Sequence, residues 1–160
     1  MSVDNVQRGL QNSTVQRNLA AHSRAVAAVV AREVPSEILA PGFRLENRVT
    51  AVTDYTYQGE TGWREWMSDL FEMFEEGAEY GEELITAGED FVAASFRIEG
   101  VGARSGTPIQ FSWVGVTWFR DGKATLAVGY PSRRDALRAV GLGDPRRQSD
   151  HGIRQARRIP

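Results

Sequence analysis

Residues 91–130 read FVAASFRIEGVGARSGTPIQFSWVGVTWFRDGKATLAVGY and predict three strands joined by turns. Phe91–Val101 is apolar and alternating, and Ile109–Arg120 is rich in the aromatic and β-branched residues that suit a half-buried strand. Asp121-Gly122 supplies two residues that tolerate positive φ, which is the strongest short-range signal for a hairpin, and Lys123–Tyr130 then returns. The stretch therefore predicts an antiparallel sheet.

The hairpin register predicts which side chains share a face of this sheet. With Asp121-Gly122 as the loop, Trp113 pairs with Tyr130. An even-numbered turn at Ala103–Gly106 then gives an inner face that carries no carboxylate, whereas an odd-numbered turn would exchange the two faces. The inner face predicted in this way consists of Val92, Ala94, Phe96, Ile98, Trp113, Gly115, Thr117, Phe119, Leu126, Val128 and Tyr130.

The opposite face has an apolar centre, made by Val114, Val116 and Trp118, among polar neighbours. An apolar centre inside a polar rim is typical of a protein interface, so we expect a homodimer through this outer face. The alternative is that these three are ordinary half-exposed strand residues.

Gly115 lies on the predicted inner face between Trp113 and Thr117. A glycine inside a strand often marks a place where another group approaches closely. The gap leaves room either for a ligand or for a large helix side chain such as Trp63 or Trp66, and the sequence favours neither.

Helices and short strands are predicted before and after this sheet. The first helix is amphipathic, follows a cap at Ser13 or Thr14, and carries His22 on its apolar stripe. Helices that precede a run of hairpins predict an α+β fold with the helices on one face of the sheet. The other expected elements are a short helix at Pro35–Leu39, strands at Phe43–Val49 and Glu79–Ala87, a helix from Thr61 to Gly77 and a closing helix from Ser132 to Gly141.

The composition is that of an ordinary globular protein of 160 residues and predicts one domain. We expect it to span residues 14–142, between a flexible N-terminus at 1–13 and a flexible basic tail at 143–160. The net charge of −2 gives no reason to expect nucleic acid, and no apolar run suggests a membrane span or a signal sequence. The absence of cysteine excludes disulfides, zinc–thiolate sites and thiol nucleophiles. A cytoplasmic protein without metal or cofactor is expected.

Charge is unevenly distributed along the chain. Eleven acidic residues lie in Glu60–Asp90, and eight arginines lie between Arg133 and Arg158. This pattern indicates a solvated acidic helix face and a flexible basic tail. Alternatively, the tail docks on an acidic surface of its own chain or of a second copy.

Four motifs together resemble the SnoaL-like branch of the NTF2-like superfamily: YQGETGWREWMSDLFEMF from Tyr57, GARSGTPIQF from Gly102, VTWFRDGKA from Val116 and YPSRRDALRAVGL from Tyr130. The resemblance extends over about Val15 to Leu142. It implies an α+β cone, in which a curved, mostly antiparallel sheet packs helices on its concave face around an apolar pocket, and commonly a dimer through the sheet. The branch includes polyketide cyclases, epoxide hydrolases and relatives of ketosteroid isomerase, so the fold alone does not assign a reaction.

The acid–base residues that the resemblance implies are absent from their usual positions. Where many relatives carry a histidine on the sheet this chain has Gly115, and where an aspartate often follows the last strand it has Ser132. Proton abstraction requires a base within reach of the substrate. The remaining candidates are His22, Asp54 and the phenols of Tyr55, Tyr57 and Tyr130. A histidine on an apolar stripe can equally be a packed residue with one hydrogen-bond partner.

Three hypotheses follow. The chain binds a small hydrophobic molecule in a pocket lined by Trp63, Trp66, Phe96, Trp113, Gly115, Thr117 and Tyr130. It is an enzyme, a cyclase, isomerase or hydrolase acting on a hydrophobic substrate, with His22 or Asp54 as base and a tyrosine such as Tyr57 as donor. Or it is a non-catalytic homodimeric scaffold in which the pocket is only core.

Overall fold

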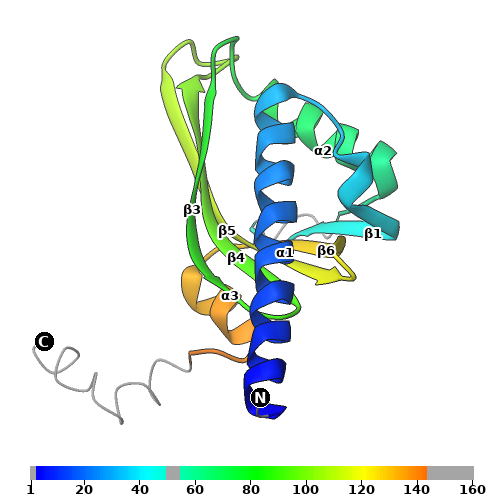
Figure 1. Cartoon of the computed structure of the whole chain (residues 1–160). Coiled ribbons are helices and arrows are strands. Elements are labelled where there is room, and N and C mark those ends of the chain that lie inside the picture. Colours follow the sequence, from blue (N-terminus) through cyan, green and yellow to red (C-terminus); the bar gives the residue numbers. More distant parts are fainter. Residues whose placement is uncertain (1–2, 50–54, 144–160) are drawn as a thin grey trace, which may run out of the picture.

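The computed structural model describes residues 3–49 and 55–143, which form a curved sheet with helices on both of its faces (Figure 1). The elements in chain order are α1 (Val3–Ala31), a 3-10 turn η1 (Ser36–Ile38), β1 (Leu39–Asn47), β2 (Thr56–Gln58), α2 (Gly59–Glu72), β3 (Glu79–Ala87), β4 (Phe91–Val101), β5 (Pro108–Arg120), β6 (Lys123–Tyr130) and α3 (Arg133–Ala139).

The six strands lie in the order β2-β1-β6-β5-β4-β3. Every neighbouring pair is antiparallel except β1 and β6, which run parallel. The long helix α1 crosses the concave face of the sheet, and α2 lies on the same side (Figure 1). The predicted α+β class, with a mostly antiparallel curved sheet, is therefore confirmed.

The two predicted hairpins have the expected turns. Val101 pairs with Pro108, so the intervening turn has an even number of residues and Phe96 shares a face with Trp113, as expected. The two residues are direct partners across β4 and β5. Asp121 and Gly122 have φ of 53° and 78°, as a tight hairpin turn requires.

The predicted pairing of Trp113 with Tyr130 is wrong because β6 contains one extra residue. The register shifts after Phe119 pairs with Ala124, so that Leu126 lies opposite Trp118 and Tyr130 opposite Val114. A bulge of this kind reverses the alternation of side chains beyond it. Leu126, Val128 and Tyr130 therefore belong to the outer face, and Ala127 and Gly129 belong to the inner one.

Helix α1 begins at Val3, well before the predicted cap at Ser13 or Thr14. No proline interrupts this stretch, and a single glycine in a helix interior costs only about 1 kcal/mol relative to alanine. The first turns of α1 extend beyond the edge of the sheet (Figure 1). Neither α1 nor another helix within 3–49 and 55–143 has an apolar stretch long enough to cross a membrane.

The short helix α3 covers part of the outer face. Its N-cap is Ser132, whose Oγ accepts a hydrogen bond from the backbone N–H of Asp135 at 3.1 Å. Ala136 is buried against an outer-face cluster that includes Val114 and Val116. These two residues of the predicted dimer interface are 9% and 0% exposed, so the chain itself buries them.

Candidate functional site

A cavity of about 310 Å³ lies between the concave face of the sheet and the two helices α1 and α2. Its walls are mainly apolar, and they come from both helices and from most strands of the sheet. The apolar lining includes Val26, Val29, Ile38, Phe43, Leu45, Leu70, Met73 and Phe119.

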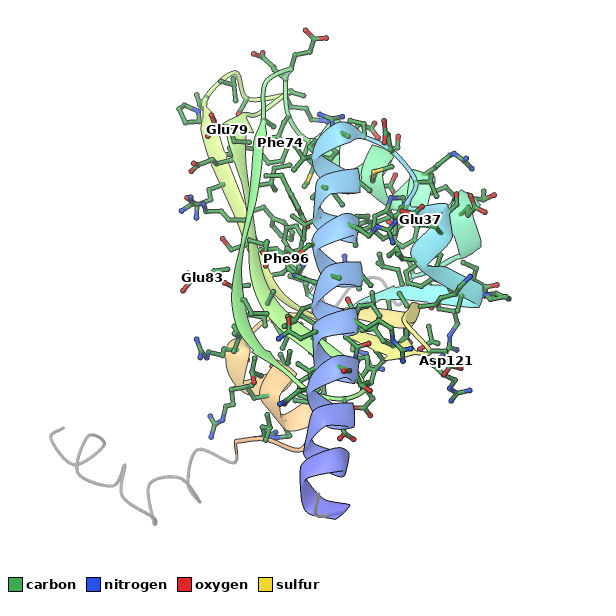
Figure 2. The ribbon with its side chains drawn as sticks, viewed as in Figure 1. Glu37, Phe74, Glu79, Glu83, Phe96 and Asp121 are labelled. Carbon is green, nitrogen blue, oxygen red and sulfur yellow. The ribbon has the colours of Figure 1, made fainter. Side chains whose placement is uncertain are left out.

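One wall of the cavity is a row of aromatic rings on three adjacent strands. The Tyr80 and Phe96 rings stack with centroids 5.9 Å apart, and the Phe96 and Trp113 rings stack at 5.5 Å. Phe111 follows on the far side of Trp113, with centroids 5.4 Å apart. Figure 2 shows Phe96 lying between its strand and α1. Such a wall presents a broad apolar surface to a ligand.

Gly115 makes room for this aromatic row. A Cβ built on Gly115 would lie 2.7 Å from the Phe96 ring, closer than a carbon atom can approach. The space therefore accommodates Phe96 from the neighbouring strand, rather than Trp63 or Trp66 from α2. Gly115 also contributes to the cavity lining.

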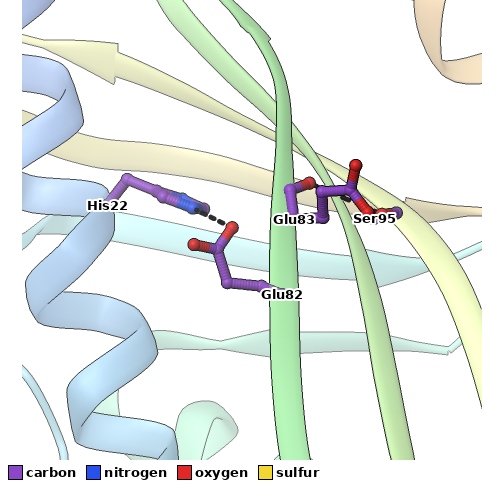
Figure 3. Close-up of polar contacts among 4 residues, drawn as sticks. All are labelled: His22, Glu82, Glu83 and Ser95. Atoms are coloured by element: carbon purple, nitrogen blue, oxygen red, sulfur yellow. Dashed lines mark hydrogen bonds and ion pairs between the residues drawn. The ribbon is translucent and has the colours of Figure 1, made fainter.

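His22 on α1 and Glu82 on β3 form a polar pair at one side of the cavity (Figure 3). The His22 Nε2 and the Glu82 Oε2 are 3.1 Å apart. His22 is 6% exposed, and the side chain of Glu82 is 25% exposed. His22 is thus a packed histidine with one hydrogen-bond partner, as one of the two predicted alternatives stated. It also lines the cavity.

Two neighbouring contacts fix the positions of His22 and Glu82. One helical turn before His22, the buried Asn18 donates through Nδ2 to the carbonyl oxygens of Gly88 and Glu89 at 3.3 and 2.8 Å. These bonds hold α1 against the turn that joins β3 to β4. Glu82 lies opposite Phe96 in the sheet and so shares the aromatic face.

The other imidazole nitrogen of His22, Nδ1, has no hydrogen-bond partner in the described part of the chain. Among the described residues no buried side-chain nitrogen or oxygen lacks a partner, so Nδ1 retains accessible surface. If Nε2 carries the proton and donates it to Glu82, Nδ1 is an available base. A carboxylate partner also stabilises the imidazolium that forms when Nδ1 accepts a proton.

Tyr80 lies two residues before Glu82, on the same face of β3, and lines the cavity. Its hydroxyl has no hydrogen-bond partner among the described residues, and by the reasoning given for Nδ1 it retains accessible surface. Burial, and then the charge of Glu82, raise the pKa of Tyr80 above its ordinary value. The phenol is therefore neutral near neutral pH and can donate a hydrogen bond.

A second polar pair lies at the opposite edge of the sheet. The Tyr57 hydroxyl on β2 donates to Oδ2 of Asp69 on α2 at 2.6 Å, and both residues line the cavity. Burial, followed by the hydrogen bond to Asp69, raises the pKa of Tyr57. Tyr55 packs edge-on against Tyr57 but is exposed and lies outside the cavity lining.

The structure brings together most of the residues that the sequence singled out. Tyr130 does not join them, because the bulge in β6 turns it to the outer face, and Asp54 lies outside the described residues. The cavity walls include, from the predicted set, His22, Tyr57, Trp63, Trp66, Phe96, Trp113, Gly115 and Thr117.

The sequence analysis missed Glu82, Tyr80 and Asp69. The expectation that the inner face carries no carboxylate was drawn from β4, β5 and β6, and the next strand, β3, supplies Glu82. Alternation along β3 would have placed Tyr80 and Glu82 on one face. No signal in the sequence showed that this face is the inner one. Within 3–49 and 55–143, no group of side chains could hold a metal ion.

The SnoaL-like domain family matches residues 17–127 of this chain. The chain belongs to this family.

Solved structures agree in fold. A putative SnoaL-like polyketide cyclase from Jannaschia sp. CCS1 is 19% identical, with a TM-score of 0.60 over 72% of this chain and 85% of the other. TerC, co-crystallised with polyporic acid, is 21% identical, with a TM-score of 0.58 over 71% and 89%. A hypothetical protein with a ketosteroid isomerase-like fold from Catenulispora acidiphila DSM 44928, in complex with trimethylamine, is 17% identical, with a TM-score of 0.57 over 77% and 93%. No curated protein matches the chain at a significant level.

Proposed function

We propose that this chain binds a small hydrophobic molecule in the cavity and transfers a proton within it, as a cyclase or isomerase does. The observation that carries the proposal is that His22, in the wall of a mainly apolar cavity, contacts Glu82, with Nε2 and Oε2 3.1 Å apart. The reaction class is chosen because the chain shares its fold with a putative SnoaL-like polyketide cyclase and with a hypothetical protein that has a ketosteroid isomerase-like fold.

The proposed step is proton abstraction next to a carbonyl group. The Nδ1 of His22 takes a proton from the carbon adjacent to the ligand carbonyl, and the electron pair moves onto the carbonyl oxygen as an enolate. Glu82 stabilises the imidazolium, and the Tyr80 phenol donates a hydrogen bond to the enolate oxygen. The imidazolium then returns its proton to carbon. Alternatively, the enolate carbon attacks a second carbonyl carbon of the same ligand, the π electron pair of that carbonyl moves onto its oxygen, and this alkoxide takes the proton from the imidazolium.

The test is deuterium exchange into 2-tetralone, an apolar bicyclic ketone with acidic protons next to its carbonyl. Exchange in D₂O is followed by proton NMR, with and without protein. We expect the protein to accelerate exchange over buffer, and His22→Ala to lower the rate by about 100-fold or more, the usual contribution of a general base. Exchange at the buffer rate, or full activity in His22→Ala, would contradict the proposal.

Adjacent carboxylates provide a matched control. Glu82 and Glu83 follow one another on β3, and Glu83 points away from the cavity (Figure 2). Glu82→Gln removes the charge beside His22 and should slow exchange, whereas Glu83→Gln removes an equal charge and should leave it unchanged. Equal effects of the two substitutions would indicate a general electrostatic effect rather than a catalytic pair.

A homodimer through the outer face stays a prediction that no observation tests. Because α3 buries Val114 and Val116, a second copy would contact mainly the polar residues beyond α3, such as Arg97 and Gln110. Light scattering across a dilution series gives the oligomeric state. A monomer at all concentrations would remove the dimeric scaffold from consideration.

A further inference from the structure

Two hydrogen-bonded pairs of polar side chains lie at the cavity, and only His22–Glu82 takes part in the proposed proton transfer. The other polar lining residues include Glu46, Asn47 and Thr117. His22 and Glu82 lie at β3, one edge strand of the sheet, and Tyr57 and Asp69 lie at β2, the other edge strand. Four strands separate the two edges. His22, Tyr57 and Asp69 line the same cavity, so an elongated ligand with one end at His22 can direct its other end toward the Tyr57–Asp69 pair.

The hydrogen bond between Tyr57 and Asp69 determines what this pair can offer a ligand. The phenol proton is already donated to Asp69 at 2.6 Å. The phenol oxygen and the carboxylate then have only lone pairs left, so both accept hydrogen bonds and neither donates. The raised pKa of Tyr57, caused first by burial, keeps this proton on the phenol. The pair itself therefore offers no donor to a ligand carbonyl or ether oxygen.

We propose that Tyr57 and Asp69 form a second anchor that selects ligands carrying a hydrogen-bond donor, a hydroxyl or an amine, at the end remote from the reacting carbonyl. This inference rests on the proposed function, because it takes the carbonyl end to be the one at His22. Asp69 is the residue that contacts the donor, and Tyr57 is a positioning residue that holds the carboxylate toward the cavity.

Two ketones of equal shape test the selection. 4-Acetyl-4′-hydroxybiphenyl and 4-acetyl-4′-methylbiphenyl share the carbonyl end and differ only in a hydroxyl or a methyl group at the other end. Calorimetry on the full chain gives both dissociation constants. We expect the hydroxyl compound to bind about tenfold more tightly or better, because a hydrogen bond to a carboxylate is stronger than one between neutral groups.

Three substitutions test whether Asp69 and Tyr57 cause the preference for the hydroxyl compound. Asp69→Asn keeps the shape but introduces an N–H donor, so the preference should fall to about twofold or less. Tyr57→Phe removes the hydroxyl that donates to the Asp69 carboxylate, so the carboxylate is no longer held toward the cavity. The preference for the hydroxyl compound should then fall to an intermediate value. The matched control is Glu65→Gln, because Glu65 lies one turn earlier on α2 and accepts from Tyr55 at 3.1 Å, outside the cavity lining. This control should retain the full preference.

The outcomes separate this inference from the proposed function. Equal affinity of the two ketones for the unsubstituted chain, or an undiminished preference in Asp69→Asn, overturns the anchor even if 2-tetralone exchange is catalysed. Failure of both ketones to bind also overturns it. Loss of exchange in His22→Ala together with loss of preference in Asp69→Asn supports both.

Discussion

The imidazole of His22 and the carboxylate of Glu82 meet at 3.1 Å although the two residues are 60 positions apart in the chain. Helix α1 brings one and the edge strand β3 brings the other, so the pair exists only when the helix is seated on the concave face. The cavity forms at the same interface. A change that loosens α1 should therefore affect stability, the polar pair and ligand binding together.

Asn18 anchors α1 to the sheet, so its substitution tests the seating of the helix directly. It is 1% exposed and donates to two carbonyl oxygens in the β3–β4 turn. Asn18→Ala leaves those carbonyls without their donor and should lower the free energy of unfolding by about 1–3 kcal/mol. Urea denaturation measures the loss. Ser23→Ala, at an exposed position of the same helix, should cost far less, and an Asn18→Ala chain as stable as the parent would contradict this role.

Gly115 should not tolerate a methyl group. In Gly115→Ala the new Cβ meets the Phe96 ring, which has to leave its stack with Trp113. Overpacking of this kind costs about 1–3 kcal/mol, and the near-ultraviolet circular dichroism of the aromatic row should change. Gly81→Ala on β3 is the control, because a Cβ there meets nothing within 4 Å. An unchanged spectrum in Gly115→Ala would show that the row is not closely packed.

Tyr80 should make the protein sensitive to alkali. Burial and the charge of Glu82 raise its folded pKa above the ordinary value of 10.0. Below pH 10.0 the phenol is neutral in both the folded and the unfolded chain, and its contribution to stability is fully present. Above pH 10.0 the phenol ionises in the unfolded chain but not yet in the folded one, so this contribution is progressively lost. The free energy of unfolding should fall by about 1.4 kcal/mol per pH unit for this one group.

Urea titrations between about pH 9 and pH 12 measure this slope in the parent and in Tyr80→Phe, which should be less sensitive. Tyr55→Phe is the comparison, because Tyr55 is exposed and its pKa is raised mainly by the hydrogen bond to Glu65. Solvent screens that contribution, so its removal should alter the slope less. An identical slope in Tyr80→Phe and the parent would contradict the assignment.

Local rules predicted much of the fold. Periodicity and turn chemistry predicted the turn at Asp121-Gly122, the bounds of β4 and β6, and the shared face of Phe96 and Trp113. The bulge in β6 did not, because one extra residue leaves no mark on composition yet reverses the side chains beyond it. For that reason the sequence placed Tyr130 on the inner face, and the structure places it on the outer one.

The candidate site was less accessible to sequence reasoning, because it depends on contacts between distant segments. His22 drew attention as a histidine on an apolar stripe, but its partner could not be identified: Glu82 and Glu83 are equivalent in sequence and face opposite sides of β3 (Figures 2 and 3). The same holds for Asp69, one of many carboxylates on α2, whose contact with Tyr57 follows from the placement of α2 beside β2.

The most direct measurement of the central claim is a titration of 2-tetralone into protein carrying ¹³C-labelled histidine, followed by NMR. The chain has two histidines, so the His22 ring signal is assigned as the one that is lost in His22→Ala. We predict a saturable shift of the His22 ring signal that is abolished by Thr117→Trp, which fills the cavity from β5. A His22 signal that does not move, or one that moves equally in the Thr117→Trp chain, would contradict binding in this cavity.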